Sequence, residues 1–213
     1  TLYSSSAASD VYKRQVVTLL MPRLADYLTR HAPGVQLRLQ LTAGRAQELL
    51  DQQDVDFAVS AFGELPERFE KLELLRDRYV CLVRSGHPLC EGKLTLERFA
   101  AARHLLVSPR GDERGFVDTE LAALGMQRQV ALVINQFAPA GKLLAASDMI
   151  LTATERLARV LGEEHDLTVL PLPVATPVAF TSTDLVWHRR FGKHPALAWF
   201  RAVLSELAGD SAP

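Results

Sequence analysis

The sequence predicts an α/β fold of two lobes joined by two crossover strands. Signals for strands and helices alternate along most of the 213 residues, which is typical of sheets flanked by helices. Tyr79–Val83 is a short, unbroken apolar run between Arg78 and Arg84, and such a run predicts a strand buried on both faces. A comparable strand returns only at Val178–His188. We therefore expect a first lobe, a crossing into a second lobe, and a return to the first.

These signals divide the chain into three parts. Residues 16–76 together with 173–213 are expected to form lobe I, and residues 77–172 to form lobe II. Residues 1–15 are rich in Ser and Ala and differ from the rest of the chain. Within them, Ser5–Gln15 resembles a translated adaptor tract that recurs in assembled environmental gene fragments. We expect residues 1–15 to be non-native and the gene product to be truncated.

Lobe I opens with a helix followed by strand signals. Leucines at helical spacing predict a helix over residues 16–31, with Pro22 marking its start or a kink. Val35–Leu41 alternates strictly between apolar and polar residues, which predicts a half-buried strand. A short helix at Gly44–Asp51 and a strand at Asp54–Val59 follow. Strand, helix and strand in this order predict a right-handed βαβ unit.

In lobe II the expected elements are bounded by capping and turn residues. Thr95 is suited to cap one helix, and Gly125 to end another. The expected strands are His104–Val107, Val130–Ile134, Asp148–Leu151 and Leu167–Leu170. The expected helices are Thr95–Ala102, one that ends at Leu124, Gln136–Ala146 and Thr154–Leu161. After the return strand, Pro195 opens a helix that runs to about Leu207.

The composition limits the classes of function that this chain can have. The net charge of −1 offers no bulk electrostatic case for binding nucleic acid or an anionic membrane. No apolar run approaches the length of a membrane span. Cys81 and Cys90 lack CxxC spacing, so buried thiols in a reducing cytosol are the simpler interpretation.

Several separated motifs occur together in one order. They are Leu20–Leu24, Ala32–Val35, Asp54–Val59, Arg78–Leu89, Asp184–Arg190 and Pro195–Phe200. In this order they resemble the effector-binding domain of LysR-type transcriptional regulators, in the branch that contains nodulation regulators and regulators of aromatic-compound degradation. The resemblance covers nearly everything from Val16 to Leu207.

The resemblance implies a fold, a function and partners. The fold is two Rossmann-like lobes of the periplasmic-binding-protein type II-like kind, and an inducer binds between the lobes to control transcription. The family's DNA-binding winged helix-turn-helix and its linker helix are missing, as are its first strand and the polar turn after it. We expect a bacterial, cytoplasmic homodimer or tetramer that contacts DNA only through the missing domain and contacts no membrane. Residues 16–31 and 35–41 would contribute to dimerisation.

Polar and aromatic residues follow successive strands of both lobes. Open α/β sheets bind ligands at the carboxyl ends of their strands. The candidate ligand-binding residues are Ser60, Phe62, Ser108, Arg110, Asn135, Gln136, Phe137, Thr152 and Thr154. Hydroxyls, amides and phenyl rings suit a small, flat ligand with polar edges, and nearby helix N-termini would favour a carboxylate.

Each candidate also has a structural interpretation. Ser108, Thr152 and Thr154 would serve equally as helix caps or turn residues. Phe62 and Phe137 are also typical of a core, and the alternative for the Arg110 side chain, beside Gly111, is a position in solvent. The clustering of the candidates supports a site more than any one of them does.

Other function classes find less support in the sequence. Nucleophile-elbow, phosphate-loop and dinucleotide-binding motifs are absent, and Glu163–Asp166 suits a solvated acidic turn better than a metal site. We expect no catalytic site, no metal and no cofactor. A periplasmic-type solute-binding protein would share the two-lobed architecture but would carry a signal peptide. A porphyrin-pathway deaminase would need a reactive cysteine in a loop, whereas Cys81 lies in the apolar strand and Cys90 lacks a supporting motif.

Overall fold

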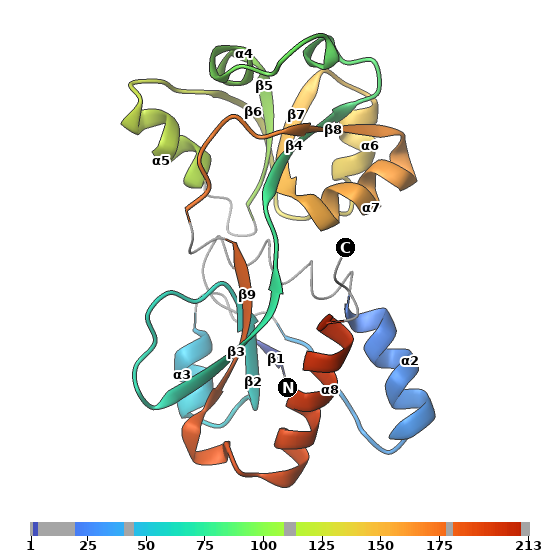
Figure 1. The fold of residues 1–213 in the computed structure, drawn as a ribbon, viewed down its shortest axis with the longest axis vertical. Coiled ribbons are helices and arrows are strands. Elements are labelled where there is room, and N and C mark those ends of the chain that lie inside the picture. Colours follow the sequence, from blue (N-terminus) through green and yellow to red (C-terminus); the bar gives the residue numbers. More distant parts are fainter. Residues whose placement is uncertain (1, 4–19, 41–44, 109–113, 178–180, 210–213) are drawn as a thin grey trace. The chain divides into compact units, whose positions relative to one another are not determined.

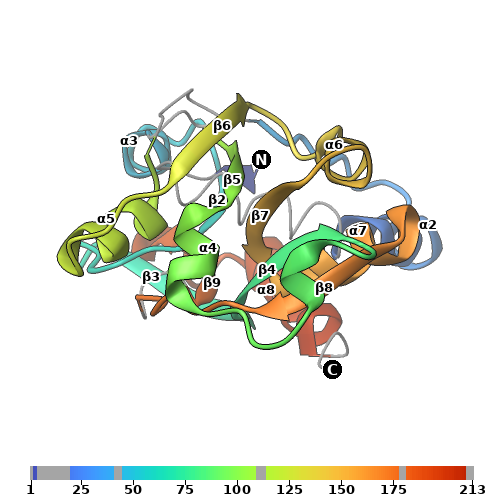
Figure 2. The ribbon, with the colours of Figure 1, turned by 90° about the horizontal axis from the view of Figure 1, so that it is seen from above.

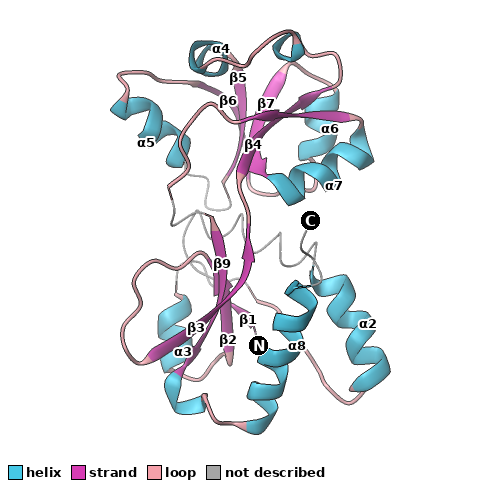
Figure 3. Cartoon of the chain, viewed as in Figure 1, coloured by secondary structure: helices cyan, strands magenta, loops and turns pink. Residues whose placement is uncertain are grey.

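In a computed structural model the chain forms two α/β units, each with its own sheet (Figures 1 and 3). The structure describes residues 2–3, 20–40, 45–108, 114–177 and 181–209. Unit 1 comprises Thr1–Arg76 and Ser182–Pro213, and unit 2 comprises Asp77–Thr181. Candidate Arg110 lies outside the described residues.

Unit 1 contains a four-stranded sheet in the order β1-β2-β9-β3. Its strands are β1 (Leu2–Tyr3), β2 (Phe57–Ser60), β3 (Phe69–Arg76) and β9 (Ser182–His188). Its helices are α2 (Met21–His31), α3 (Ala46–Asp51), the short 3-10 helix η4 (Arg189–Phe191) and α8 (Pro195–Gly209). Strand β9 lies between β2 and β3 and is antiparallel to both. The centre of this sheet is therefore completed by a late part of the chain.

The apolar faces of α2 and α8 form one core with the sheet. Leu24 and Leu28 of α2 are buried against Leu185 of β9 and Phe200 of α8. Pro22 lies in the first turn of α2, where its missing N–H costs no helical hydrogen bond. The described part of the predicted helix is thus confirmed from Met21 to His31.

The predicted strand at Val35–Leu41 is wrong over its described part. Residues 35–40 form no strand, and only Leu39 makes an isolated bridge. A strand needs a neighbour for its hydrogen-bond ladder, and the unit 1 sheet places none of its described strands there. The expected βαβ unit is therefore not seen, and Val35, Leu37 and Leu39 remain at least 37% exposed.

Unit 2 contains a five-stranded sheet in the order β6-β5-β7-β4-β8. Its strands are β4 (Tyr79–Arg84), β5 (Arg103–Val107), β6 (Gln129–Ile134), β7 (Met149–Thr154) and β8 (Leu167–Pro171). Its helices are the 3-10 helix η2 (Pro88–Cys90), α4 (Leu96–Ala101), α5 (Phe116–Ala123), α6 (Ala140–Ala145) and α7 (Glu155–His165). Strands β6, β5 and β7 are mutually parallel, and β4 is antiparallel to β7 and β8. Helices α4 and α5 lie on one face of the sheet and α6 and α7 on the other (Figure 2).

Local chemistry explains the helix ends in unit 2. The Thr95 hydroxyl accepts a hydrogen bond from the Arg98 N–H and caps α4, as predicted. Gly125 has φ +70°, a conformation that suits the end of α5. Helix α6 is shorter than predicted because it begins only at Ala140, after Pro139. Strand β7 extends to Thr154, past the predicted end at Leu151.

The return to unit 1 comes later than the sequence indicates. The sequence places it at residue 173, whereas the chain through Thr181 groups with unit 2. Val174 explains the difference, because it is 7% exposed and packs in the unit 2 core with Phe99 and Leu121. Among the described residues, no helix combines the length and apolar character needed to span a bilayer.

Candidate functional site

Three hydroxyl groups in unit 2 are buried without a hydrogen-bond partner in the described structure. They are Ser108 Oγ, Thr152 Oγ1 and Thr154 Oγ1. Ser108 is 4% exposed and Thr154 is fully buried. Buried hydroxyls normally find a partner, so three such groups in one unit indicate a place where something else supplies the hydrogen bonds.

The three hydroxyls belong to one face and one edge of the sheet. Strands β5 and β7 pair in parallel, with Leu105 opposite Leu151, so Ser108 and Thr154 both lie at the carboxyl ends of adjacent strands. The Ser108 N–H extends the ladder by donating to the Ile134 carbonyl at 2.8 Å. By strand alternation, Thr152 and Thr154 share a face with Ile150, which packs against α4 and α5.

Aromatic side chains border these hydroxyls. Tyr79 of β4 is the register partner of Thr154, and its ring centroid lies 4.7 Å from that of Phe116, the first residue of α5. Cys81 is the register partner of Thr152 and is fully buried. The hydroxyls therefore occur beside two rings, at the start of α5.

Three backbone donors at the helix N-termini of this edge already have partners within the chain, and the expected ligand carboxylate there stays a prediction. In α7 the Glu155 N–H donates to the Arg78 carbonyl at 2.8 Å, and the Arg156 N–H donates to the Asp77 carboxylate at 3.3 Å. At α5 the Gly115 N–H donates to Asp118 Oδ2 at 2.7 Å. One backbone carbonyl and two carboxylates of the chain thus satisfy these three donors.

The remaining candidates fall into two groups. Ser60 and Phe62 belong to unit 1, where Ser60 donates to the Ala61 carbonyl and Phe62 packs in a core cluster with Leu49 and Val186. Phe137 is 4% exposed, whereas Asn135 and Gln136 are exposed after β6. The three hydroxyl residues are the candidates that the sheet of unit 2 brings together.

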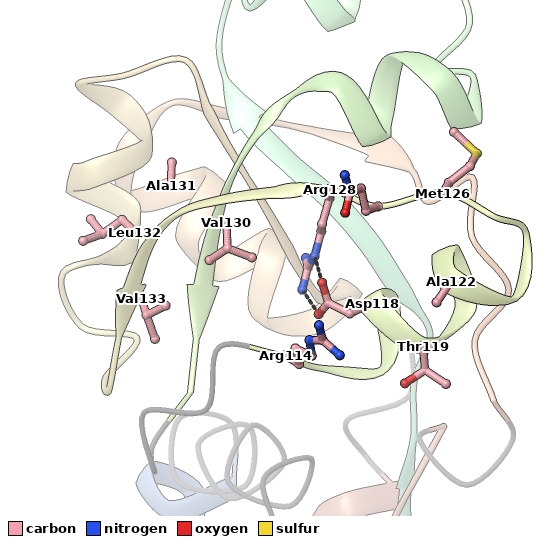
Figure 4. Close-up of a pocket in the computed structure, with 11 residues that line it drawn as sticks. Arg114, Asp118, Thr119, Ala122, Met126, Arg128, Val130, Ala131, Leu132 and Val133 are labelled. Atoms are coloured by element: carbon pink, nitrogen blue, oxygen red, sulfur yellow. Dashed lines mark hydrogen bonds and ion pairs between the residues drawn. The ribbon is translucent and has the colours of Figure 1, made fainter.

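A chain of charged groups connects α5 with the sheet (Figure 4). Arg128 binds Asp118 through two hydrogen bonds of 2.7 and 2.9 Å, and its Nη1 lies 3.3 Å from His104 Nδ1. Burial raises the pKa of Asp118, but hydrogen bonds from Arg128 and from the Gly115 N–H outweigh burial and hold that pKa below its ordinary value. Burial, and then the Arg128 charge, lower the pKa of His104 to about 4.

A groove of about 690 Å³ lies between α5 and β6, and Asp118 and Arg128 are among the residues that line it (Figure 4). Its lining includes Arg114, Ala122, Met126 and Leu132, and none of the three hydroxyl residues. The hydroxyl cluster is the stronger candidate, because its polar atoms lack partners whereas Asp118 and Arg128 in the groove satisfy each other.

Redox and metal chemistry find no support in the described part of the chain. Burial raises the pKa of the Cys81 thiol to about 12, and the nearby Cys90 adds to this effect, so Cys81 is a poor nucleophile. No group of three potential metal ligands occurs among the described residues.

Sequence reasoning missed Tyr79 and Phe116 as walls of the candidate site, and it missed Asp118 and Arg128. Tyr79 carried a usable signal, since it is an aromatic residue at the start of the buried strand. The link between Asp118 and Arg128 had no signal, because ten residues and a helix end separate them.

Comparison with known proteins agrees with this architecture. A family model described as the LysR substrate binding domain matches residues 15–209. The chain is 34% identical to the HTH-type transcriptional activator NahR of Pseudomonas putida over 191 residues, which are 89% of this chain and 63% of NahR. It is 31% identical to the HTH-type transcriptional activator NagR of a Ralstonia species, covering 90% of this chain and 63% of NagR. The chain thus spans less than two thirds of these relatives.

A solved structure shows the same fold. The regulatory domain of MexT, a transcriptional activator in Pseudomonas aeruginosa, superimposes with a TM-score of 0.78 and 29% identity, covering 97% of this chain and 96% of that one. The architecture is two Rossmann-like α/β units of the periplasmic-binding-protein type II-like kind, and the likeness to regulators does not favour a solute-binding protein. The chain belongs to the family of LysR substrate-binding domains.

Proposed function

We propose that this chain is the sensor of a cytoplasmic transcription regulator and that its inducer is a small aromatic or carboxylated molecule. The observation that carries this proposal is the set of three buried, unpartnered hydroxyls at Ser108, Thr152 and Thr154. A buried hydroxyl without a hydrogen bond costs about 1–3 kcal/mol. A ligand that brings oxygen acceptors would recover that free energy on binding.

The surroundings support the proposed class of ligand. Hydroxyl groups donate hydrogen bonds to carboxylate or phenolic oxygens, and the rings of Tyr79 and Phe116 offer a flat apolar wall. Arg110, the expected partner of a carboxylate, stays a prediction. Asn135, Gln136 and Phe137 follow the adjacent strand and stay candidates for the rim of the site.

For the whole protein we propose that a DNA-binding domain outside this chain acts on transcription. This chain would signal to that DNA-binding domain whether inducer is bound, and it would catalyse no reaction. The similarity to NahR and NagR supports this proposal, because both are named as HTH-type transcriptional activators.

Thermal unfolding with a ligand panel tests the sensor proposal. Benzoate, hydroxybenzoates and short dicarboxylates are added to the unaltered chain and to Thr154→Val and Ser108→Ala. A ligand at 100 times its Kd stabilises the folded state by about 2.7 kcal/mol, so we expect the melting temperature of the unaltered chain to rise by several degrees. In both variants the ligand should no longer raise the melting temperature. Without ligand, both variants should melt at a temperature no lower than that of the unaltered chain.

Thr95→Ala is the matched control. It removes a hydroxyl in the same unit that already has a partner, the Arg98 N–H. It should lower stability by about 1 kcal/mol and keep the ligand response. An equal ligand response in Thr154→Val, Ser108→Ala and the unaltered chain would remove the hydroxyl cluster from the site.

We also propose that the protein is a homodimer or tetramer, with the extended segment at residues 35–40 in the interface. The support is its alternating exposed side chains Val35, Leu37 and Leu39, which lie on a segment that belongs to neither of the two described sheets. Analytical ultracentrifugation of the chain with Leu37→Asp and Leu39→Asp should show weaker self-association. Unchanged association would place the interface elsewhere.

A further inference from the structure

The hydrogen bonds around Arg128 form one continuous path through unit 2, of which Figure 4 shows the part between Arg128 and Asp118. The Arg128 side chain is 2% exposed and binds both oxygens of Asp118. Its third nitrogen, Nη1, lies 3.3 Å from His104 Nδ1. On the far side of the ring, His104 Nε2 lies 2.9 Å from the Phe99 carbonyl oxygen. The path thus joins the last turn of α4, strand β5, the start of β6 and helix α5.

The protonation of His104 follows from its two partners. A carbonyl oxygen only accepts, so Nε2 carries the hydrogen that is donated to Phe99. Nδ1 is then free to accept from Arg128. A neutral ring satisfies both contacts at once, and His104 is fully buried, so water does not replace either partner. Arg128 is therefore fixed on two sides.

The other end of the path is the first turn of α5. Asp118 Oδ2 accepts the Gly115 N–H at 2.7 Å, so the ion pair also fixes the residue that precedes the helix. Gly115 lies beside Leu106, whose Cδ1 would be 3.9 Å from a Cβ added at residue 115. The next residue, Phe116, contacts the Tyr79 ring.

These contacts place the start of α5 over the unpartnered hydroxyls. Leu106 precedes Ser108 by two residues, so both side chains point to one face of the sheet. Tyr79 is opposite Thr154 in the register. Gly115 and Phe116 therefore cover the part of the sheet face that carries Ser108 and Thr154.

We propose that Arg128, Asp118 and His104 are positioning residues of the inducer site: they hold the start of α5 over the hydroxyls and so set access and affinity without touching the ligand. This inference rests on the proposed function, since it assigns a role within the same site. Helix α5 has only eight residues, too few to hold its place by its own helical hydrogen bonds. Its fixed position must come from tertiary contacts such as these.

Thiol labelling measures access to the hydroxyls without any ligand. Ser108→Cys, made in a Cys90→Ser background, places a reactive group among them, and dithionitrobenzoate is the probe. Cys81 provides an internal reference, because it is fully buried and burial raises the pKa of its thiol to about 12. Cys81 reacts only when unit 2 unfolds as a whole.

The test variants are Arg128→Lys and Asp118→Asn. Lysine keeps the charge but not the two parallel hydrogen bonds, and asparagine keeps an acceptor for the Gly115 N–H but not the charge. We expect the Ser108→Cys thiol to react about tenfold faster in either variant while the labelling rate of Cys81 changes little. His104→Asn keeps an oxygen acceptor for Arg128, so the labelling rate of the Ser108→Cys thiol should increase less in this variant.

Arg84→Lys is the matched control. It weakens another hydrogen-bonded ion pair of unit 2, Arg84 with Asp148 at 2.7 Å, which lies at the opposite end of β4. Labelling of the Ser108→Cys thiol should not change. Two results would overturn the positioning role and leave a purely structural ion pair. In the first, Arg128→Lys does not change the labelling rate of the Ser108→Cys thiol. In the second, that rate rises only in proportion to the labelling rate of Cys81.

Stabilisation by benzoate, measured in chains that keep Ser108, separates the two proposals. If benzoate raises the melting temperature of the unaltered chain, and Arg128→Lys raises the concentration needed by about tenfold, both proposals hold. If no compound of the panel stabilises the chain, the proposed inducer class fails, whereas the ligand-free labelling rates of the Ser108→Cys thiol still decide whether Arg128 positions α5.

Discussion

The candidate hydroxyls at strand ends differ between the two units, because that of unit 1 has a hydrogen-bond partner and those of unit 2 lack one among the described residues. In unit 1 Ser60 donates to the Ala61 carbonyl, and the buried Asp184 accepts from Lys71 at 3.0 Å. In unit 2 the hydroxyls of Ser108 and Thr154 have no partner among the described residues. The position of a polar residue at the end of a strand thus identifies a candidate, and whether its side chain already has a hydrogen-bond partner ranks the candidates.

The largest expected effect tests whether the units behave as separate bodies. Phe99→Ala removes a fully buried ring from the unit 2 core and should cost about 3–5 kcal/mol. Both tryptophans, Trp187 and Trp199, belong to unit 1, so their fluorescence follows that unit alone. In urea, circular dichroism should lose part of its signal early while the fluorescence midpoint stays close to that of the unaltered chain.

The reverse variant completes this test. Leu185→Ala removes a fully buried side chain from unit 1 and should lower the fluorescence midpoint directly. If both probes shift together in both variants, the units unfold cooperatively and a comparison of their separate stabilities has no basis.

Acidification is expected to weaken unit 2 through His104. Burial, and then Arg128, lower the pKa of this side chain to about 4 in the folded state, whereas an unfolded histidine titrates near about 6.5. The unfolded state therefore binds the proton first as the pH falls, and unit 2 should lose up to about 3 kcal/mol between about pH 6.5 and 4. Urea unfolding followed by circular dichroism across this range measures the slope.

His104→Gln is the control for the pH effect. It removes the titrating group, so the slope between about pH 6.5 and 4 should flatten in the variant. An equally steep loss in the variant would assign the acid sensitivity to a group other than His104 and Asp118. The pKa of Asp118 is lowered in the folded state, so its contribution is lost only as the pH falls below about 4.

The smallest expected effect bears most directly on the comparison of the units. Thr154→Val removes a buried hydroxyl that has no partner and should raise the free energy of unfolding by about 1 kcal/mol. Ser60→Ala removes one that has a partner and should lower it by about 0.5–1 kcal/mol. The denaturant midpoints of the two variants show whether the free energy of unfolding rises or falls in each. If both variants lower the free energy of unfolding by the same amount, the Thr154 hydroxyl has a hydrogen-bond partner in solution.

The sequence predicts the elements of unit 2 well because their signals are local. Thr95 and Gly125 act at helix ends through their own conformation and hydrogen bonds, and the apolar run at Tyr79–Val83 needs no information about its neighbours. The strand expected at residues 35–40 failed for the opposite reason. Its alternation is genuine, but a strand exists only beside another strand, and periodicity carries no information about that neighbour.

The site is predictable only in part, for a similar reason. Ser108, Thr152 and Thr154 became candidates because the carboxyl ends of parallel strands meet at one edge, and their role in binding stays a prediction. Phe62 was placed in the same set, but its side chain turned into a unit 1 core cluster. The bonds of Arg128 with Asp118 and His104 depend on how α5 packs on the sheet, which no spacing in the sequence expresses.

The place of β9 between β2 and β3 has a consequence for biosynthesis. Unit 2 is one continuous segment, so its core can close as soon as residue 181 has left the ribosome. The unit 1 sheet cannot close then, because its central strand and α8 have not yet left the ribosome. The apolar face of α2 therefore stays exposed until α8 has emerged. Released chains that end before residue 182 should contain a folded unit 2 and an unfolded unit 1.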